Sequence, residues 1–264
     1  MSDTIEHEKI KELEELLGLI SKDIEIVGKE FSKILLKKVY SPAIIDLSNE
    51  LSVSVEYRRH IETMLVDLRR FLDKVVFTYL EIKNWTAKIK NDKCNEIAFP
   101  FSDPEKKFEK LLDTEELLEF QKTKLWNFFE LKKNYEKDRN QDQAIEMLNG
   151  VYRTSHRGLT AADVKSCLII LGMKIFAGAV IDCSNFNVIT SKREMVLVES
   201  FKSLDNSSYR IEFMITSTFS SGRKPYLNMA INQETFYKDM NVMSLLRDSH
   251  ALAKGALEAM KGSL

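Results

Sequence analysis

The chain contains 264 residues, of which 44% are hydrophobic and 30% are charged, and its formal net charge at pH 7 is −1. This balance is typical of a soluble folded protein and excludes a disordered chain, in which low hydrophobicity and high net charge prevent a core from forming. The sequence holds only four prolines and nine glycines, so it favours long helices over a loop-rich fold.

A heptad pattern runs through the first predicted helix, residues 4–39. A repeat of about 3.5 residues keeps an apolar stripe facing one neighbour, so the pattern favours coiled-coil packing. The stripe must be covered by another helix, which belongs either to this chain or to a second one. We therefore predict it as an interface. Its apolar residues, spaced alternately three and four apart, are Ile10, Leu13, Leu17, Ile20, Ile24, Val27, Phe31 and Ile34.

A second helix is predicted to begin at Ser41 and Pro42, because serine is a preferred N-cap residue and proline suits the first helical position. It is expected to continue to about Lys90. Its apolar residues spread more widely than a two-stranded seam requires, which indicates contact with several neighbours, as in a bundle. They include Ile61, Met64, Leu65, Leu68, Phe71, Leu72, Val75, Tyr79, Ile82, Trp85 and Ile89.

Residues 91–104 contain two prolines and several turn-forming residues, so they are predicted as a loop. Asp103 and Pro104 then have the residue types that begin a helix. This third helix is expected to carry apolar residues as far as Tyr135 and to fade within the polar residues 132–143.

The pattern changes after Gly150. Residues 160–163 resemble a capping box and predict a short apolar helix that ends near Leu171. Alternating apolar and polar residues then predict an antiparallel meander of about four strands. A final helix is expected over residues 233–260. The expected strands are residues 174–182, 195–198, 209–216 and 227–231.

These elements predict an α+β fold in two parts. Residues 1–150 form a long-helix bundle or coiled coil, and residues 151–264 form a small antiparallel β-meander flanked by helices, including the C-terminal one. This order of elements resembles, in outline, the helix-plus-RWD proteins of kinetochores. The proline and tyrosine motif that marks RWD domains is absent, so the resemblance assigns no role to any residue of this chain.

The sequence contains no motif typical of a catalytic or metal site. None of the four histidines lies in an HExxH motif, and no nucleophile elbow or glycine-rich phosphate loop is found. Cys94, Cys167 and Cys183 are odd in number and lack CxxC spacing, which argues against a disulfide framework and a zinc site. We therefore expect no cofactor and no metal, and an enzymatic role is the less favoured class.

Two further features bear on the compartment. The charged N-terminus has no apolar region of the kind found in a secretory signal. The longest apolar run, residues 167–181, falls short of the roughly 18 to 20 residues that a membrane-spanning helix needs. We therefore expect no membrane span and a location in the cytoplasm or another reducing compartment inside the cell.

The charge is distributed unevenly. Residues 1–150 hold 30 acidic and 25 basic side chains, a net charge of −5, whereas residues 151–264 hold 10 and 14, a net charge of +4. This mild basic excess permits an anionic partner.

Two basic segments are candidates for binding a phosphate group. One precedes a predicted helix start, where free backbone N–H groups attract anions, and the other is a predicted hairpin tip with an aromatic that could stack on a base. For both, the competing interpretation is a solvated polar loop without a ligand. The candidate residues are Arg153, Ser155, His156 and Arg157 in the first segment and Arg223, Lys224 and Tyr226 in the second.

The leading hypothesis is a non-enzymatic interaction or assembly protein. It would oligomerise, or dock to a helical protein partner, through its amphipathic helices. The alternative is a nucleic-acid-binding protein, such as a viral, phage or recombination accessory protein, that uses the mildly basic residues 151–264. The sequence by itself identifies neither the partner nor the number of copies.

Overall fold

The structure is a computed structural model in which two compact units are distinguished. The first comprises Met1–Ile26, Arg59–Leu159 and Ser244–Leu264, and the second comprises Val27–Arg58 and Thr160–Met243. This division differs from the predicted boundary at residue 150, because almost all of the C-terminal helix belongs to the first unit. The described residues are 2–33, 44–46, 53–101, 103–133, 143–150, 159, 163–170, 173–176, 179–190, 194–203, 211–215, 232–237 and 240–264.

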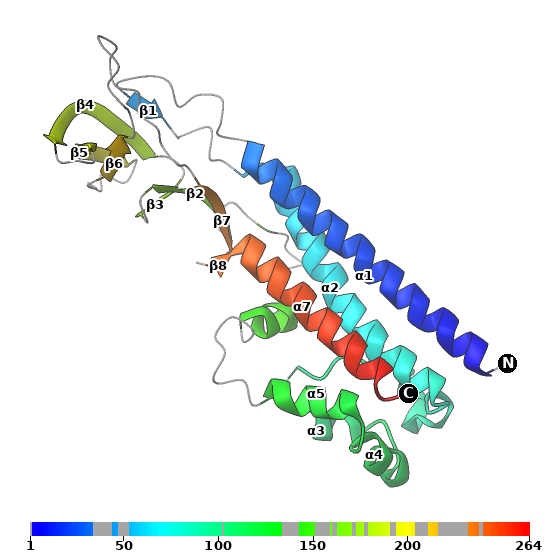
Figure 1. The fold of residues 1–264 in the computed structure, drawn as a ribbon. Coiled ribbons are helices and arrows are strands. Elements are labelled where there is room, and N and C mark those ends of the chain that lie inside the picture. Colours follow the sequence, from blue (N-terminus) through cyan, green and yellow to red (C-terminus); the bar gives the residue numbers. More distant parts are fainter. Residues whose placement is uncertain are drawn as a thin grey trace. The chain divides into compact units, whose positions relative to one another are not determined.

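The first unit is helical. Most of α1 (Ser2–Lys33), α2 (Val55–Ile82) and α7 (Val242–Lys261) belongs to it, and these parts of the three helices lie side by side (Figure 1). Their apolar stripes face one another and form the core, as the wide apolar face of the second predicted helix implies. The core residues of these helices within this unit include Leu13, Leu17, Ile20, Ile24, Ile61, Leu65, Leu68, Phe71, Leu72, Val75, Leu245, Leu246, Leu252, Ala253, Ala256 and Leu257.

Local hydrogen bonds fix both ends of α2, and these ends differ from the prediction of a helix over residues 41–90. The Ser54 side chain accepts a hydrogen bond from the Tyr57 N–H at 3.1 Å, as an N-cap does. At the other end Asn84 adopts a positive φ of 56°, and the Trp85 N–H donates to the Leu80 carbonyl at 2.8 Å. This is the Schellman pattern, which terminates a helix although apolar residues continue the stripe beyond it.

Short helices replace the single third helix that was predicted. They are α3 (Pro104–Phe108), α4 (Thr114–Phe120) and α5 (Lys124–Lys133). Before them, the 3₁₀ helix η1 (Thr86–Lys88) lies within the predicted second helix, and the 3₁₀ helix η2 (Lys90–Glu96) overlaps the residues 91–104 predicted as a loop. Residues 143–150 are also helical.

The predicted start of α3 is confirmed, because the Asp103 side chain accepts a hydrogen bond from the Lys106 N–H at 3.2 Å and proline occupies the first helical position. A second capping residue begins α5. The Thr123 hydroxyl accepts from the Trp126 N–H at 3.1 Å, so the chain starts a new helix where the apolar spacing suggested a continuous one.

Aromatic side chains join α2 to the short helices. The rings of Tyr79 and Phe120 stack with centroids 5.2 Å apart, and Phe108 meets Phe120 edge-on at 4.9 Å. Burial raises the pKa of the Tyr79 hydroxyl to about 12, so this side chain is neutral over the physiological range. Helix α5 also approaches α7 closely: a Cβ atom at Gly255 would lie 2.9 Å from the Phe128 ring.

The strands of the second unit form two antiparallel sheets among the described residues. Their orders are β1-β4-β5-β6 and β3-β2-β7-β8. The strands are β1 (Ile44–Asp46), β2 (Val164–Ile170), β3 (Met173–Phe176), β4 (Ala179–Thr190), β5 (Glu194–Ser203), β6 (Ile211–Ile215), β7 (Asn232–Tyr237) and β8 (Met240–Asn241).

The predicted single four-stranded meander is not supported, because the described strands belong to two sheets, although β5 and β6 pair antiparallel over two of the predicted strands. The expected strand over residues 174–182 is divided between β3 and β4, which belong to different sheets. The helix predicted up to Leu171 is also wrong, because Val164 and the apolar residues after it pair as β2, where β-branched side chains are favoured. The expected strand at 227–231 lies outside the described residues.

The last predicted helix begins later than expected. Residues 232–237 pair with β2 as strand β7, and α7 starts only at Val242. Apolar residues upstream of α7 can also be fitted to a helical spacing. The sequence pattern by itself therefore predicts a helix over residues that pair as strand β7.

The α1 stripe should carry much of the stability of the helical unit. Leu13 is fully buried, whereas Leu19, on the same helix, is 57% exposed. We predict that Leu13→Ala lowers the free energy of unfolding by about 2–5 kcal/mol, because it removes buried methyl groups and leaves a cavity. Leu19→Ala should change it by less than about 0.5 kcal/mol. Equal effects in urea denaturation would show that α1 does not pack on the core.

Candidate interaction surface

The central part of the predicted heptad stripe is covered within the chain itself. Leu13, Leu17, Ile20, Ile24 and Val27 are at most 7% exposed. Ile10 is partly exposed, the side chain of Phe31 is not among those described, and Ile34 lies outside the described residues. The stripe therefore contributes to the core of one chain.

Ion pairs flank the stripe and identify its two neighbours. Lys9 pairs with Glu81 at 2.6 Å and Glu12 pairs with Lys74 at 2.5 Å, so this flank of α1 faces α2. The hydrogen bond and charge of Lys74 lower the pKa of Glu12. Because Lys9 lies against Glu81 and Glu12 against Lys74, α1 and α2 run antiparallel.

The opposite flank of α1 faces α7. Glu14 pairs with Lys261 at 2.8 Å, and its hydrogen bond raises the pKa of that lysine. One helical turn further along α1, the Leu17 backbone acts on the His250 ring and partly offsets the effect of burial on its pKa. Burial lowers the pKa of His250, so its neutral form is favoured. The histidine belongs to the contact between two helices.

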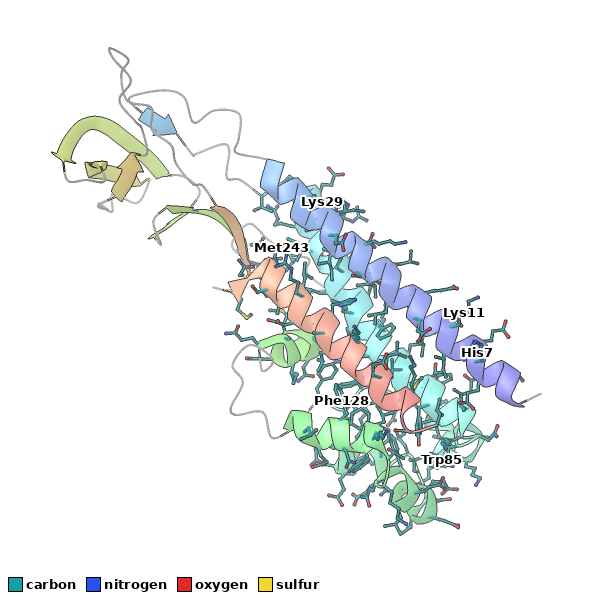
Figure 2. The ribbon with its side chains drawn as sticks, in the orientation of Figure 1. His7, Lys11, Lys29, Trp85, Phe128 and Met243 are labelled. Carbon is teal, nitrogen blue, oxygen red and sulfur yellow. The ribbon has the colours of Figure 1, made fainter. Side chains whose placement is uncertain are left out.

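Half-exposed apolar side chains also occur on α1, in the same heptad row as Glu12, at the outer edge of the flank that faces α2. Ile5, Leu19 and Ile26 are 55%, 57% and 52% exposed. Their positions differ by multiples of seven, so they share one face of the helix. Figure 2 shows side chains of α1, among them Lys11, that project from the helix away from α7. Isolated exposed leucines are ordinary, but a row at heptad spacing is typical of a helix with a partner.

Helix α2 adds one residue to this side of the unit. Phe77 is 38% exposed and lies three residues after Lys74 and four before Glu81, the two residues that pair with α1. This spacing places the phenylalanine on the side of α2 that faces the α1 flank. We call Ile5, Leu19, Ile26 and Phe77 the outer apolar row.

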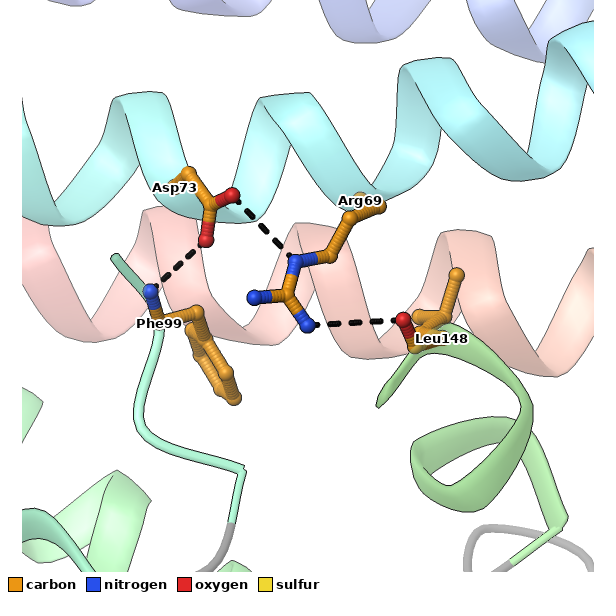
Figure 3. A network of polar contacts seen from close by, with 4 residues as sticks. All are labelled: Arg69, Asp73, Phe99 and Leu148. Atoms are coloured by element: carbon orange, nitrogen blue, oxygen red, sulfur yellow. Dashed lines mark hydrogen bonds and ion pairs between the residues drawn. The ribbon is translucent and has the colours of Figure 1, made fainter. Parts of the chain in front are cut away.

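A polar network at the middle of α2 is the second candidate site (Figure 3). The Asp73 carboxylate accepts hydrogen bonds from the Phe99 N–H at 2.7 Å and the Arg69 Nε at 3.2 Å. Arg69 also donates to the Leu148 carbonyl at 3.4 Å, and its guanidinium lies 4.0 Å from the centroid of the Phe101 ring. The network therefore ties residues 97–101 and the helix at 143–150 to α2.

This network has some features of an active site, but its contacts are those of a structural anchor. Burial lowers the pKa of Lys107, which the nearby Asp73 carboxylate partly offsets. Shifted pKa values of this kind occur at catalytic sites and in structural ion-pair networks alike. Both oxygens of Asp73 are hydrogen-bonded within the chain, and these contacts account for its position without a ligand.

The basic segments singled out from the sequence are not described by the structure. Arg153, Ser155, His156, Arg157, Arg223, Lys224 and Tyr226 all lie outside the described residues. The structure therefore neither brings the two segments together nor separates them, and their role in binding an anion stays a prediction.

Metal and thiol chemistry was not expected from the sequence. In the part of the chain that the structure describes, no three His, Cys, Asp or Glu side chains are grouped as metal ligands would be. His7, His60 and His250 lie on three different helices. Cys94 is a partly buried free thiol whose sulfur lies 3.6 Å from the Thr86 carbonyl oxygen.

The comparisons with known proteins supply no relative. No protein-family model matches this chain, and neither the curated proteins nor the solved structures give a match. Among the described helices, none has a run of apolar residues long enough to cross a membrane.

The outer apolar row is not among the predictions from the sequence, although its heptad spacing can be seen there. Ile5, Leu19 and Ile26 repeat at multiples of seven residues, as the stripe does. The stripe of eight dominated the pattern, and only the exposed fractions show that a second set of apolar residues on the same helix stays uncovered.

The Asp73 network gives a stability prediction. Asp73→Ala should lower the free energy of unfolding by about 1–3 kcal/mol, because the Phe99 N–H and the Arg69 guanidinium lose a charged acceptor. The matched control is Asp67→Ala on the same helix, whose carboxylate makes only a 3.8 Å contact with Arg70 and should cost less than about 0.5 kcal/mol. Denaturant titration measures both, and the network has no anchoring role if the two variants unfold alike.

Proposed function

We propose that this protein is a non-enzymatic assembly protein that oligomerises, or docks to a protein partner, through its helices. The observation that carries this proposal is the outer apolar row. The stripe of α1 is covered by α2 and α7, yet three further apolar residues of the same helix remain about half exposed at heptad spacing. Exposed apolar rows of this type are commonly buried by another helix.

The packing of the helical unit supports this reading. Helices α1 and α2 are held together by buried apolar residues and by ion pairs along their shared flank. A partner would therefore meet a surface that is already formed, and association would not require a helix to fold first. A preformed surface of this kind lowers the entropic cost of binding.

Nucleic-acid binding is the second candidate function. It is favoured by the net charge of +4 on residues 151–264 and by the two basic segments within them. Phosphate contacts would dominate such binding, so the apparent affinity for single-stranded DNA or RNA would fall steeply with salt concentration. Retention of a labelled oligonucleotide at low ionic strength, lost when Arg153, Arg157, Arg223 and Lys224 are all changed to Glu, would favour this candidate.

The assembly proposal predicts a change in mass when the outer apolar row is made polar. The parent should form a species heavier than the 30.6 kDa of one chain, measured by light scattering over a concentration series. Leu19→Glu combined with Ile26→Glu should return it to that mass, because two charges replace apolar contacts. Its melting temperature should stay close to that of the parent, since both positions are exposed.

A matched control is Leu131→Glu on α5, where the leucine is 65% exposed but lies outside the outer apolar row. This variant should keep the mass of the parent. A parent that has the mass of one chain at every concentration would contradict the oligomerising form of the proposal.

A further inference from the structure

A row of charged side chains on the outer face of α1 changes from negative to positive along the helix. Glu8 and Glu15 lie in its first half and Lys22 and Lys29 in its second half, all at intervals of seven residues. All four are exposed. This row of the face therefore runs from acidic to basic, and reversing its direction converts it into its own electrostatic complement.

An antiparallel pair of such helices would bring opposite charges together. If two copies of α1 met in antiparallel order with the middle of the contact between residues 18 and 19, Glu15 of each copy would lie opposite Lys22 of the other. Glu8 would lie opposite Lys29 in the same register. A parallel pair would instead oppose Glu15 with Glu15 and Lys22 with Lys22, and like charges opposed in this way are destabilising.

The neighbouring row of the same face has the opposite order, a basic residue followed by an acidic one, and this order also complements itself on reversal. Lys11 and Glu25 are both exposed and lie symmetrically about residue 18, half a residue from the middle set by Glu15 and Lys22, so in that register each lies within one residue of the level of the other. Within one chain, Lys11 makes only a loose contact with Glu15, at 3.8 Å between two side chains that are each 67% exposed. Its ammonium group can therefore reach a carboxylate of another helix.

The centre of this face is shaped for close approach. No atom lies within 4 Å of the position that a Cβ atom would take at Gly18, so the backbone is open to solvent there. The adjacent Leu19 is 57% exposed. In the antiparallel register, Leu19 of one copy would lie against Gly18 of the other, and the missing side chain would leave room for it.

We propose that the outer face of α1 is a self-complementary interface that binds the same face of a second copy of this chain, antiparallel, around a two-fold axis near Gly18. This inference rests on the proposed function and names the partner and the orientation. A two-fold interface uses the same patch twice, so every complementary contact occurs in duplicate. The charge order of this face fits a second copy of the chain because it complements itself on reversal.

Charge-reversal variants test the orientation. Glu15→Lys alone places two lysines opposite each other twice, so it should weaken the dimer at least about tenfold in Kd. Glu15→Lys combined with Lys22→Glu restores opposite charges in the antiparallel register and should bring the Kd back toward the parent value. Sedimentation equilibrium at low salt measures all three proteins, and added salt should weaken the parent dimer.

The matched control is Glu105→Lys, an exposed carboxylate on α3, which should leave the Kd unchanged. A parent that dimerises while Glu15→Lys has no effect, or while the double variant fails to recover, would overturn the antiparallel interface and leave the assembly function standing. A parent that never dimerises would overturn both this interface and the oligomerising form of the proposed function.

Discussion

The need of helix α1 to cover its apolar stripe determines the arrangement of the helical unit. A helix of this length with a continuous apolar seam is not stable in water by its own hydrogen bonds, and its stability comes from packing. Here α2 and α7 cover the seam from two sides, and ion pairs on each flank set the direction of the neighbours. The short helices α3, α4 and α5 then join the same core through an aromatic cluster at the end of α2.

This arrangement separates two roles on one helix. The stripe packs within the chain, so the outer face of α1 is the surface of this helix that remains for an assembly partner. That face combines a row of exposed apolar side chains with charges whose sign reverses along the helix. Each feature extends over about six turns of α1, and together they support a partner that is itself a helix.

The sequence predicted the helical elements better than their ends or the strands. Leu13 and Leu17 could be assigned to a buried stripe because periodicity alone reports burial, and Asp103 could be assigned to a cap. The end of α2 at Ile82 depends on Asn84 adopting a left-handed conformation, which no period reveals. The pairing of residues 164–170 with β7 joins segments that are distant in the sequence. The local pattern predicts a helix there, because it carries no information about such a pairing. The sequence predicted the stripe as an interface but could not say whether one chain or two would cover it.

The central claim is that α1 completes the core of a single chain. Amide hydrogen exchange of the full chain tests it most directly, measured for residues 13–24 of α1 at two protein concentrations that differ widely. The account predicts protection in α1 that is comparable with that in α2 and independent of concentration, because α2 and α7 of the same chain cover the stripe. Rapid exchange in α1 at the lower concentration, with protection gained only at the higher one, would contradict the account and show that a second chain is needed to cover it.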